Sequence, residues 1–192
     1  MEIIYRRLKR GDENSYRRLH LESLKTFPDF FGTRYEEQSK VEKLQFETAI
    51  ETESEDNFMF GAFAGEQLVG IAGFRRGDRP KTRHRGELVQ VFVNPGFHGQ
   101  KIGESLIREV LAASFALPGV EILELSAVAT NPVQKLYEKL GFETYVVRQN
   151  YFKIDGKSWD QRFMELAKEK YLSENHVLPG EDRTDTARGS NA

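Results

Sequence analysis

The sequence predicts an α/β domain built on a sheet of about seven strands, with helices packed against it. Three observations support this prediction. Apolar stretches of strand length recur along residues 1–168, and two pairs of them are joined by short glycine-containing turns. Segments whose apolar residues have helical spacing lie between the other strands. A chain of 192 residues with 39% hydrophobic and 30% charged residues is large enough for one well-packed domain.

The N-terminal part predicts a strand followed by two helices. The opening strand covers residues 3–6, and Asp12 is placed to cap a helix that runs through Lys25. The expected buried stripe of this helix consists of Tyr16, Leu19, Leu21 and Leu24. A second helix is expected over residues 34–51, from the spacing of Val41, Leu44, Phe46 and Ile50.

The central part predicts a hairpin, a third strand and a long helix. Residues 58–64 and 68–74 are expected to form two strands joined by a turn at Gly65-Glu66-Gln67. A further central strand is expected at residues 87–93. The helix that follows it should run to about Ala116, because proline and glycine come directly afterwards.

The next part predicts a buried strand and a short helix. Residues 121–127 form the expected strand. Asn131-Pro132 is expected to cap and open the helix, since proline is tolerated at the first helical position. Gly141 follows the last apolar residue of the helical pattern and should end the helix.

The C-terminal part predicts a closing hairpin and a tail. Residues 143–154 and 158–166 flank Asp155-Gly156, a strong hairpin signal. Residues 169–192 are polar and almost without aromatic residues, and we expect them to form a mobile tail. The expected domain is therefore residues 1–168.

Composition limits the partners and the chemistry. A net charge of -2 predicts no broad attraction to nucleic acid or to anionic membranes. The chain has no cysteine, which excludes disulfides, thiolate metal sites and a cysteine nucleophile and is compatible with a cytoplasmic location. The four histidines show no metal-ligand spacing, so no metal is expected. No apolar run is long enough to span a membrane, and the first residues lack a signal-peptide core.

A glycine-bearing loop between the strand at residues 87–93 and the following helix is the first motif with chemical meaning. A helix that begins in this way offers unpaired N–H groups and a positive dipole end, which suit a phosphate or diphosphate. Gly99 and Gly103 would let the backbone approach a bulky anion. The loop matches neither the P-loop nor the dinucleotide-binding pattern. Taken alone, it is equally compatible with a tight turn whose glycines serve only packing.

A second motif follows about thirty residues later. The sequence Leu136-Tyr137-Glu138-Lys139-Leu140-Gly141-Phe142 is a helix end with a glycine C-cap, preceded by Asn131. Alone, it predicts only core residues and an amphipathic tyrosine.

Together, in this order, the two motifs resemble the GNAT superfamily of acetyl-CoA-dependent N-acetyltransferases. The family's diphosphate motif is Gln/Arg-x-x-Gly-x-Gly/Ala, and this chain has His98-Gly99-Gln100-Lys101-Ile102-Gly103. The later family helix carries Asn, then Leu-Tyr, then Gly-Phe, as seen here. The resemblance covers roughly residues 1–168. It implies a three-layer α/β fold with a mixed, mainly antiparallel sheet and helices on both faces. The cofactor would lie in a cleft opened by the central strand.

This chain departs from the family pattern at three positions. His98 replaces the usual Gln or Arg and would add less positive charge at neutral pH. Lys101 replaces a glycine, which crowds the loop but offers an ammonium group to the phosphates. Asn131 is one residue closer to Leu-Tyr than is usual, which makes Thr130 an alternative occupant of that place.

The resemblance implies a set of site residues. Those expected to bind acetyl-CoA are Val91, Phe92, Val93, His98, Gly99, Gln100, Lys101, Ile102, Gly103 and Asn131. Tyr137 is the candidate general acid for the departing thiolate. Glu87 is the candidate general base, directly or through water, because an alkyl ammonium with a pKa of about 10 must lose a proton. An ion pair of Glu87 with Arg85 or another basic group is an equal alternative, and His84 is the second candidate base.

The resemblance predicts an N-acetyltransferase that acts on a primary amine. Without cysteine, the amine would attack the thioester directly in a ternary complex. Alternatives are a non-catalytic acyl-CoA sensor and, more remotely, a nucleotide-phosphate-binding domain. The acceptor, a small molecule or a protein amine, is expected to contact residues 27–37 and the closing hairpin; the candidates are Phe30, Phe31, Glu36, Glu37, Tyr151, Trp159 and Asp160. A monomer or a homodimer is expected, since the hairpin could expose a sheet edge.

Overall fold

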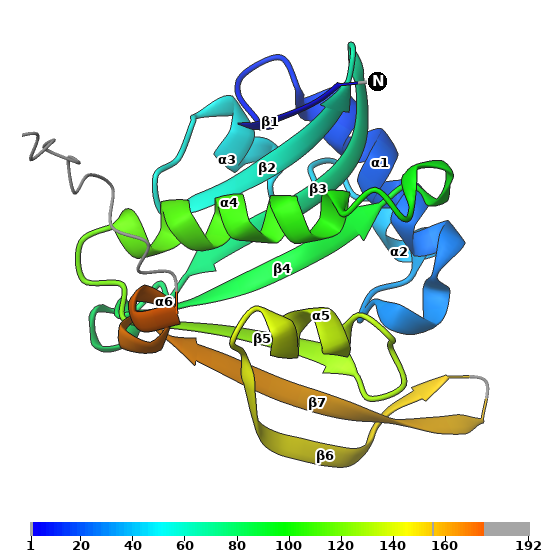
Figure 1. Cartoon of the computed structure of the whole chain (residues 1–192). Helices are drawn as coiled ribbons and strands as arrows, with labels where there is room; N and C mark the ends of the chain where they lie inside the picture. The colour runs from blue at the N-terminus through cyan, green and yellow to red at the C-terminus, as the bar shows by residue number, and fades with distance from the viewer. Residues whose placement is uncertain (1, 155, 175–192) are drawn as a thin grey trace, which may run out of the picture.

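The protein consists of a central sheet covered by helices on both faces (Figure 1). The computed structural model describes residues 2–154 and 156–174. The sheet has seven strands in the order β1-β2-β3-β4-β5-β7-β6. Every neighbouring pair is antiparallel except β4 and β5, which are parallel. This confirms the predicted mixed, mainly antiparallel α/β fold.

The strands lie close to the predicted positions. Their bounds are β1 Ile3–Arg7, β2 Asn57–Ala64, β3 Gln67–Arg76, β4 Arg85–Val93, β5 Ile122–Val128, β6 Glu143–Ile154 and β7 Lys157–Ala167. Gly65, between β2 and β3, has a φ of 60°, a conformation that glycine adopts without the steric cost of a side chain. The predicted hairpin at residues 58–74 is therefore confirmed. At the closing hairpin, Asp155 lies outside the described residues.

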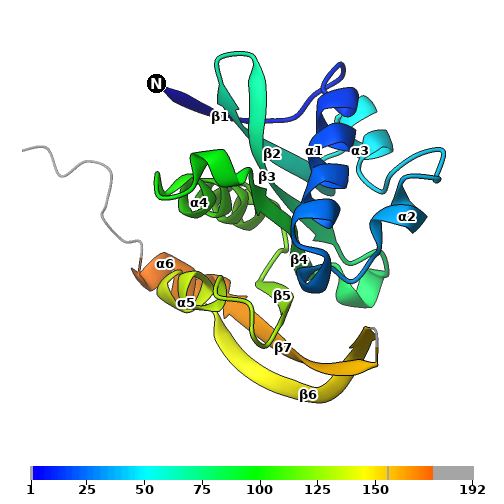
Figure 2. The same ribbon diagram turned by 90° about the vertical axis from the view of Figure 1, so that its right-hand side faces the viewer.

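The helices form two layers (Figure 2). Their bounds are α1 Glu13–Thr26, α2 Tyr35–Gln38, α3 Glu47–Glu51, α4 Ile102–Ala116, α5 Gln134–Lys139 and α6 Lys168–Glu174. Helices α1 and α3 cover one face of the sheet, and α4, α5 and α6 lie on the other. Two separate hydrophobic clusters result. Leu106, Ile107 and Val110 of α4 belong to the first, and Tyr16 of α1 packs with Phe46 and Ile50 in the second.

The start of α1 differs from the prediction in its capping. Asp12 is the N-cap residue, but its side chain makes no capping hydrogen bond. Its carboxylate instead accepts hydrogen bonds from Arg6 and from the backbone N–H of Lys9. The buried face contains Tyr16, Leu19 and Leu24 as expected, together with His20 and Ser23 in place of Leu21.

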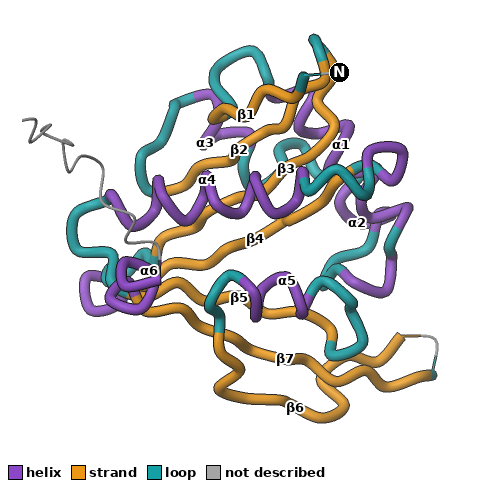
Figure 3. Tube along the Cα trace, viewed as in Figure 1, coloured by secondary structure: helices purple, strands orange, loops and turns teal. Residues whose placement is uncertain are grey.

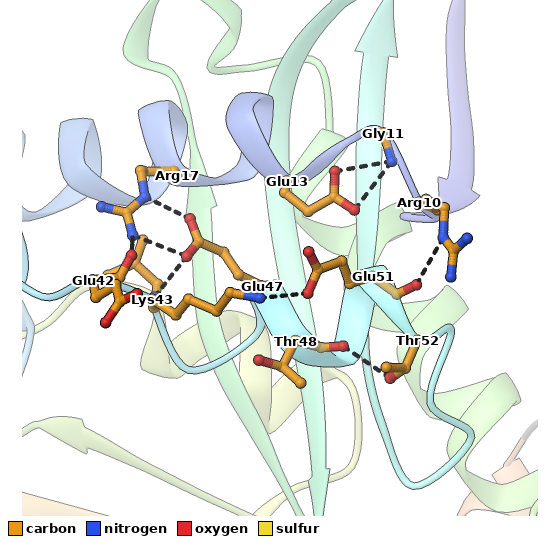
Figure 4. Close-up of polar contacts among 11 residues, drawn as sticks. Arg10, Gly11, Glu13, Arg17, Glu42, Lys43, Glu47, Thr48, Glu51 and Thr52 are labelled. Atoms are coloured by element: carbon orange, nitrogen blue, oxygen red, sulfur yellow. Dashed lines mark hydrogen bonds and ion pairs between the residues drawn. The ribbon is translucent and has the colours of Figure 1, made fainter.

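The helix predicted over residues 34–51 is wrong. Two short helices, α2 and α3, are separated by an irregular segment (Figure 3). Glu47 explains where the second one begins, because its carboxylate accepts the N–H of Leu44 at 2.8 Å and two bonds from the Arg17 guanidinium. Arg17 also donates to the carbonyl of Glu42 at 2.7 Å (Figure 4). These contacts with α1 hold the segment in a shape that a continuous helix would not allow.

Two further boundaries need correction. Helix α5 begins at Gln134, because Oδ1 of Asn131 accepts the N–H of Val133 at 3.1 Å and forms a turn before the helix. Pro132 is therefore not the first helical residue. The expected tail 169–192 begins with helix α6, whose Tyr171 packs on Phe115 with ring centroids 4.9 Å apart. Residues 175–192 lie outside the described part of the chain.

Candidate functional site

The candidate site is a cleft that opens where β4 and β5 separate. Their parallel pairing is limited to three residue pairs, from Arg85 with Ile122 to Glu87 with Glu124. Both strands continue beyond this junction, to Val93 and Val128 respectively. A cleft of about 1270 Å³ is lined by residues of both strands, by the start of α4 and by the segment after α1. The polar edge of β4 beyond Glu87 is thereby left open to a ligand.

Gln90 breaks the regular pairing of β4. The register with β3 shifts between Ile71 and Gly73, opposite residues 89–92. Gln90 has a φ of 53°, in the left-handed region that residues other than glycine rarely adopt and that is found at functional sites. An extra residue of this kind bends a strand and redirects its edge. The irregularity thus lies directly before residues 91–93, which are expected to bind acetyl-CoA.

Six consecutive backbone N–H groups surround the start of α4. Within the described residues, no acceptor pairs with those of residues 99–104, and the first bond of the helix is from Ser105 N to Lys101 O at 3.0 Å. Gly99 and Lys101 have φ values of 80° and 58°, which turn the chain into the helix. Unpaired N–H groups at the positive end of a helix dipole provide a binding site for a diphosphate.

Gly103 leaves space at this helix N-terminus. A Cβ built there would have only Val93 Cγ2 as a near neighbour, at 3.6 Å, which is an ordinary contact. Packing within the protein therefore does not require glycine at this position. Gly103 lines the cleft, so the absence of a side chain gives a bound diphosphate close access to the helix backbone. The residues present fit the acetyl-CoA that the resemblance implies.

The other residues of the loop differ in whether their side chains face the cleft or contact the rest of the protein. The His98 ring is used within the protein, since its Nε2 lies 2.9 Å from the carbonyl oxygen of Val93 and the ring stacks on Phe27. Lys101 and Ile102 line the cleft, whereas Gln100 does not. His98 therefore ties the loop to β4, and any contact it makes with phosphate would come from its backbone.

Tyr137 lines the cleft from α5. The residue is 6% exposed, and burial raises the pKa of its phenol, with no hydrogen bond contributing. The phenol therefore keeps its proton at neutral pH. Asn131 lines the cleft nearby, but Thr130 does not.

Glu87 lies in the cleft where β4 and β5 part. Its carboxylate forms an ion pair with Arg75, which is directly opposite on β3. Arg85 is not its partner, because that guanidinium bonds to Glu124 and Glu165 at 2.8 and 2.9 Å. The Glu87 side chain is 43% exposed, so water can reach it. His84, the second candidate base, does not line the cleft.

The candidate acceptor residues divide into two groups. Phe30, Phe31 and Tyr151 line the cleft, whereas Trp159 does not. The three carboxylates among the candidates also lie outside the lining: Glu36, Glu37 and Asp160. Asp160 instead accepts the N–H of Asn150 at 2.9 Å and so shapes the β6–β7 hairpin.

Two buried polar residues that the sequence did not indicate line the same cleft. They are His20 on α1, which is 4% exposed, and Gln161 on β7, which is 6% exposed. Burial lowers the pKa of His20 to about 4, so its imidazole is neutral at pH 7. His20 Nδ1 and Gln161 Oε1 are buried without a hydrogen-bond partner in the described residues. Helical periodicity would have placed His20 beside the buried stripe of α1, but nothing in the sequence singled out Gln161.

Neither metal ligands nor membrane spans are found in the part of the chain that the structure describes. No three His, Asp or Glu side chains within residues 2–154 and 156–174 come together as a candidate metal site. Over the same ranges, no helix is both long and apolar enough to cross a bilayer.

Two curated proteins are similar to this chain. It is 35% identical over 107 residues to N-alpha-acetyltransferase RimI of Mycobacterium tuberculosis, a match that covers 55% of this chain and 65% of RimI. The chain thus spans just under two thirds of the length of that relative. It is 26% identical over 175 residues to a spermidine N(1)-acetyltransferase of Vibrio cholerae, with 90% of this chain and 96% of the relative covered.

Solved structures share the fold. An acetyltransferase of the GNAT family from Streptococcus pneumoniae has a TM-score of 0.73 and 22% identity, covering 86% of this chain and 99% of that one. Arabidopsis thaliana NAA60, solved in complex with acetyl-CoA, has a TM-score of 0.65 and 19% identity, covering 88% of this chain and 99% of that one. In addition, residues 16–142, about two thirds of the chain, match the family model described as the acetyltransferase (GNAT) family. The protein belongs to the GNAT acetyltransferase family.

Proposed function

We propose that the protein transfers an acetyl group from acetyl-CoA to a primary amine. The observation that carries this proposal is the run of unpaired N–H groups at residues 99–104, which borders the cleft between β4 and β5. Such a run binds a diphosphate, and the open edge of β4 beside it suits an extended pantetheine arm. The names of the two curated relatives, both N-acetyltransferases, support the same reaction class.

Different residues of the chain bind different parts of acetyl-CoA. The N–H groups of residues 99–104 hold the diphosphate, with the Lys101 ammonium beside it. Residues 91–93 pair through their backbone with the pantetheine arm, and Asn131 borders the reacting end. When bound, acetyl-CoA supplies the activated acetyl group as a thioester.

Three groups carry the proton transfers and the polarisation. Glu87 takes a proton from the acceptor ammonium through a water molecule, which its exposure permits. A backbone N–H at the bulge in β4 polarises the acetyl carbonyl. The neutral amine then forms a bond to the carbonyl carbon as the carbon–sulfur bond breaks, and Tyr137 donates its proton to the leaving sulfur. The proton that the nitrogen loses on becoming an amide returns to the Tyr137 phenolate through water. No cysteine is present to form an acyl-enzyme, so the attack is direct.

The acceptor is a small-molecule amine or an amine of a protein or peptide. Neither nucleic acid nor a membrane is part of the proposed reaction. The cysteine-free sequence fits a cytoplasmic enzyme that acts as a monomer or a homodimer.

An assay of a panel of amines with acetyl-CoA tests the proposal. The panel contains alkyl amines, polyamines, amino acid amides and lysine peptides, and thiol release is followed with mass spectrometry of the products. We expect thiol release coupled to an acetylated product for at least one class. Binding of acetyl-CoA by calorimetry without thiol release across the whole panel would show a sensor and contradict the proposal.

A further inference from the structure

Three polar residues of the cleft bear on the acceptor. They are His20 of α1, Gln90 of β4 and Gln161 of β7, and they line the same cleft as several aromatic side chains. We call these three residues the polar wall. An inference about the acceptor rests on the proposed function, because it assumes that an amine is acetylated in this cleft.

The cleft offers no unpaired negative charge to a polycation. Within the described residues, the two carboxylates in the lining are Glu87 and Glu104. Glu87 is paired with Arg75, and Glu104 with Arg108 at 3.0 Å and Lys139 at 2.7 Å. The lining also contains Lys43, Arg75 and Lys101. A polyamine would therefore meet a surface with no excess of negative charge.

Gln161 presents a hydrogen-bond donor to the cleft. Its Oε1 is enclosed by protein without a partner. The amide nitrogen has no partner either but is not enclosed, so it is the end of the side chain that faces the cleft. The opposite orientation would bury two unpaired N–H groups instead of one oxygen, which is less favourable.

His20 also has one enclosed polar atom and one that is open to the cleft. Its Nδ1 is enclosed without a partner, whereas Nε2 is not enclosed. Because an unpaired buried N–H is rarer in proteins than an unpaired buried acceptor, the neutral ring carries its proton on Nε2 and presents a donor to the cleft. The ring is held in place by stacking on Tyr16, with centroids 5.7 Å apart.

Gln90 is the third donor. Its Oε1 accepts the hydroxyl hydrogen of Tyr16 at 2.9 Å. The two N–H bonds of its amide have no acceptor in the part of the chain that the structure describes, and Gln90 lines the cleft. All three members of the polar wall therefore present donors, and a ligand that satisfies them must carry acceptor oxygens.

The same cleft also has apolar walls. Phe27 packs against Phe30 and Phe92 with ring centroids 6.0 and 6.1 Å apart. The loop at Gly32 lies against the ring of Phe152 on β6, because a Cβ built on Gly32 would be 3.5 Å from Cζ of that ring. These aromatic walls suit an apolar side chain next to the oxygen-bearing group.

We propose that the acceptor is an α-amino group with a carbonyl oxygen on the neighbouring carbon, attached to an apolar side chain, and that the Gln161 amide donates a hydrogen bond to that oxygen. Amino acids and peptide N-termini share this chemistry. Polyamines and simple arylalkylamines lack it, since they carry no acceptor oxygen. Gln161 is the specificity-determining residue of the wall, because its side chain, unlike those of Gln90 and His20, is not engaged by Tyr16 and has no hydrogen-bond partner among the described residues.

Phenylalanine amide and 2-phenylethylamine form the decisive pair of probes, because they differ only in the carboxamide group. Wild-type protein should acetylate the amide with the higher kcat/KM. The two amines differ in pKa, so the informative quantity is the change in the ratio of their kcat/KM values caused by substitution. Gln161→Leu should reduce this ratio about tenfold, as the loss of one hydrogen bond predicts, with the KM for acetyl-CoA unchanged.

Ser114→Ala is the matched control. Ser114 Oγ is also buried without a partner, but it lies on α4 and outside the cleft, so the ratio should not change. Gln161→Glu keeps the shape and replaces the donor with a carboxylate, and it should raise kcat/KM for spermidine relative to phenylalanine amide. Phenylalanine and a Phe-Ala peptide then show whether the acceptor is a free amino acid or a peptide N-terminus. Preference for either one agrees with the proposal.

Two results would overturn it. One is a wild-type kcat/KM for spermidine or 2-phenylethylamine equal to that for phenylalanine amide. The other is an unchanged ratio in Gln161→Leu. Both leave the proposed acetyltransferase function intact, whereas the absence of any acetylated amine in the presence of bound acetyl-CoA contradicts that function.

Discussion

The hydroxyl of Tyr16 donates a hydrogen bond to Oε1 of Gln90 over 2.9 Å. Tyr16 is fully buried on α1, and Gln90 has the left-handed backbone that interrupts β4. The bond therefore joins the helical layer to the irregular point of the strand that borders the cleft. Its position indicates that α1 helps to set the shape of the strand edge on which acetyl transfer is proposed to occur.

Replacement of Tyr16 by Phe keeps the buried ring and removes this bond. We expect the free energy of unfolding in urea to fall by about 1 kcal/mol and kcat to fall as well, because the bulge loses its support. Glycine accepts the left-handed conformation without strain, so the loss in kcat should be smaller in a Gln90→Gly background. Tyr145→Phe, outside the cleft, is the control. Equal kcat in Tyr16→Phe and wild type would show that the bond does not position β4.

Tyr137→Phe tests the general acid. Since the phenol is the proposed proton donor to sulfur, kcat should fall about a hundredfold or more. The affinity for acetyl-CoA, measured by calorimetry, should stay nearly unchanged, because the ring itself is retained. Tyr35→Phe removes a hydroxyl outside the cleft and should have wild-type turnover. Unchanged turnover in Tyr137→Phe would remove this residue from the mechanism.

Glu87→Gln tests the base. At pH 7 the acceptor is mainly an ammonium ion, with a pKa of about 8 for an α-amino group and about 10 for an alkyl amine, so loss of the base should reduce kcat/KM about a hundredfold. As the pH approaches the pKa of the acceptor amine, the deficit should shrink, because the substrate then loses its proton unaided. The measurement is the pH profile of kcat/KM for both proteins, with Glu66→Gln in the β2–β3 turn as control. A deficit independent of pH would contradict a base role.

Gly103→Val tests the diphosphate site. The new side chain has room beside Val93, and valine is no worse than glycine in a helix, so stability should be nearly unchanged. Its methyl groups would occupy space next to the helix N-terminus, and the Kd for CoA measured by calorimetry should rise at least about tenfold. Glu109→Val places the same side chain on the exposed face of α4. Equal affinity in Gly103→Val and wild type would rule out this binding site.

His20 should make stability depend on pH. Its pKa is about 4 in the folded protein because of burial, against about 6.5 in the unfolded chain. Between these values only the unfolded chain takes up the proton, so the stabilisation present above pH 6.5 is lost as the pH falls toward 4. The loss is about 1.4 kcal/mol per pH unit for this group. His20→Gln should flatten the unfolding curve in this window, whereas His84→Gln should follow wild type.

The strands and the ends of helices could be predicted because the responsible residues are local. Gly65 and Gly141 have positive φ values of 60° and 92°, so glycine at these positions predicts a turn and a helix end. The Gly99-to-Gly103 loop was recognisable for the same reason, since its conformation depends on its own residues.

The errors arise where distant residues decide the outcome. The break between α2 and α3 depends on the contact of Arg17 with Glu47, thirty positions apart. The partner of Glu87 depends on the register of β3 with β4, which brings Arg75 rather than Arg85 opposite it. Gln161 enters the cleft because β7 lies between β5 and β6 in the sheet. The sequence around Gln161 does not predict this strand order.

The short junction between β4 and β5 has a consequence for the intact molecule. Among the described residues, the two portions of the sheet are joined at that seam by three residue pairs, by the N–H groups of Glu121 and Ile122 donating to the His84 carbonyl, and by the bonds of Arg85 to Glu124 and Glu165. An occupant that bonds to both walls would act as an additional strand between β4 and β5, whose residues otherwise meet through the shared hydrophobic core. Acetyl-CoA bound as proposed would therefore also stiffen this junction, and the free protein should flex about the seam more than the loaded one.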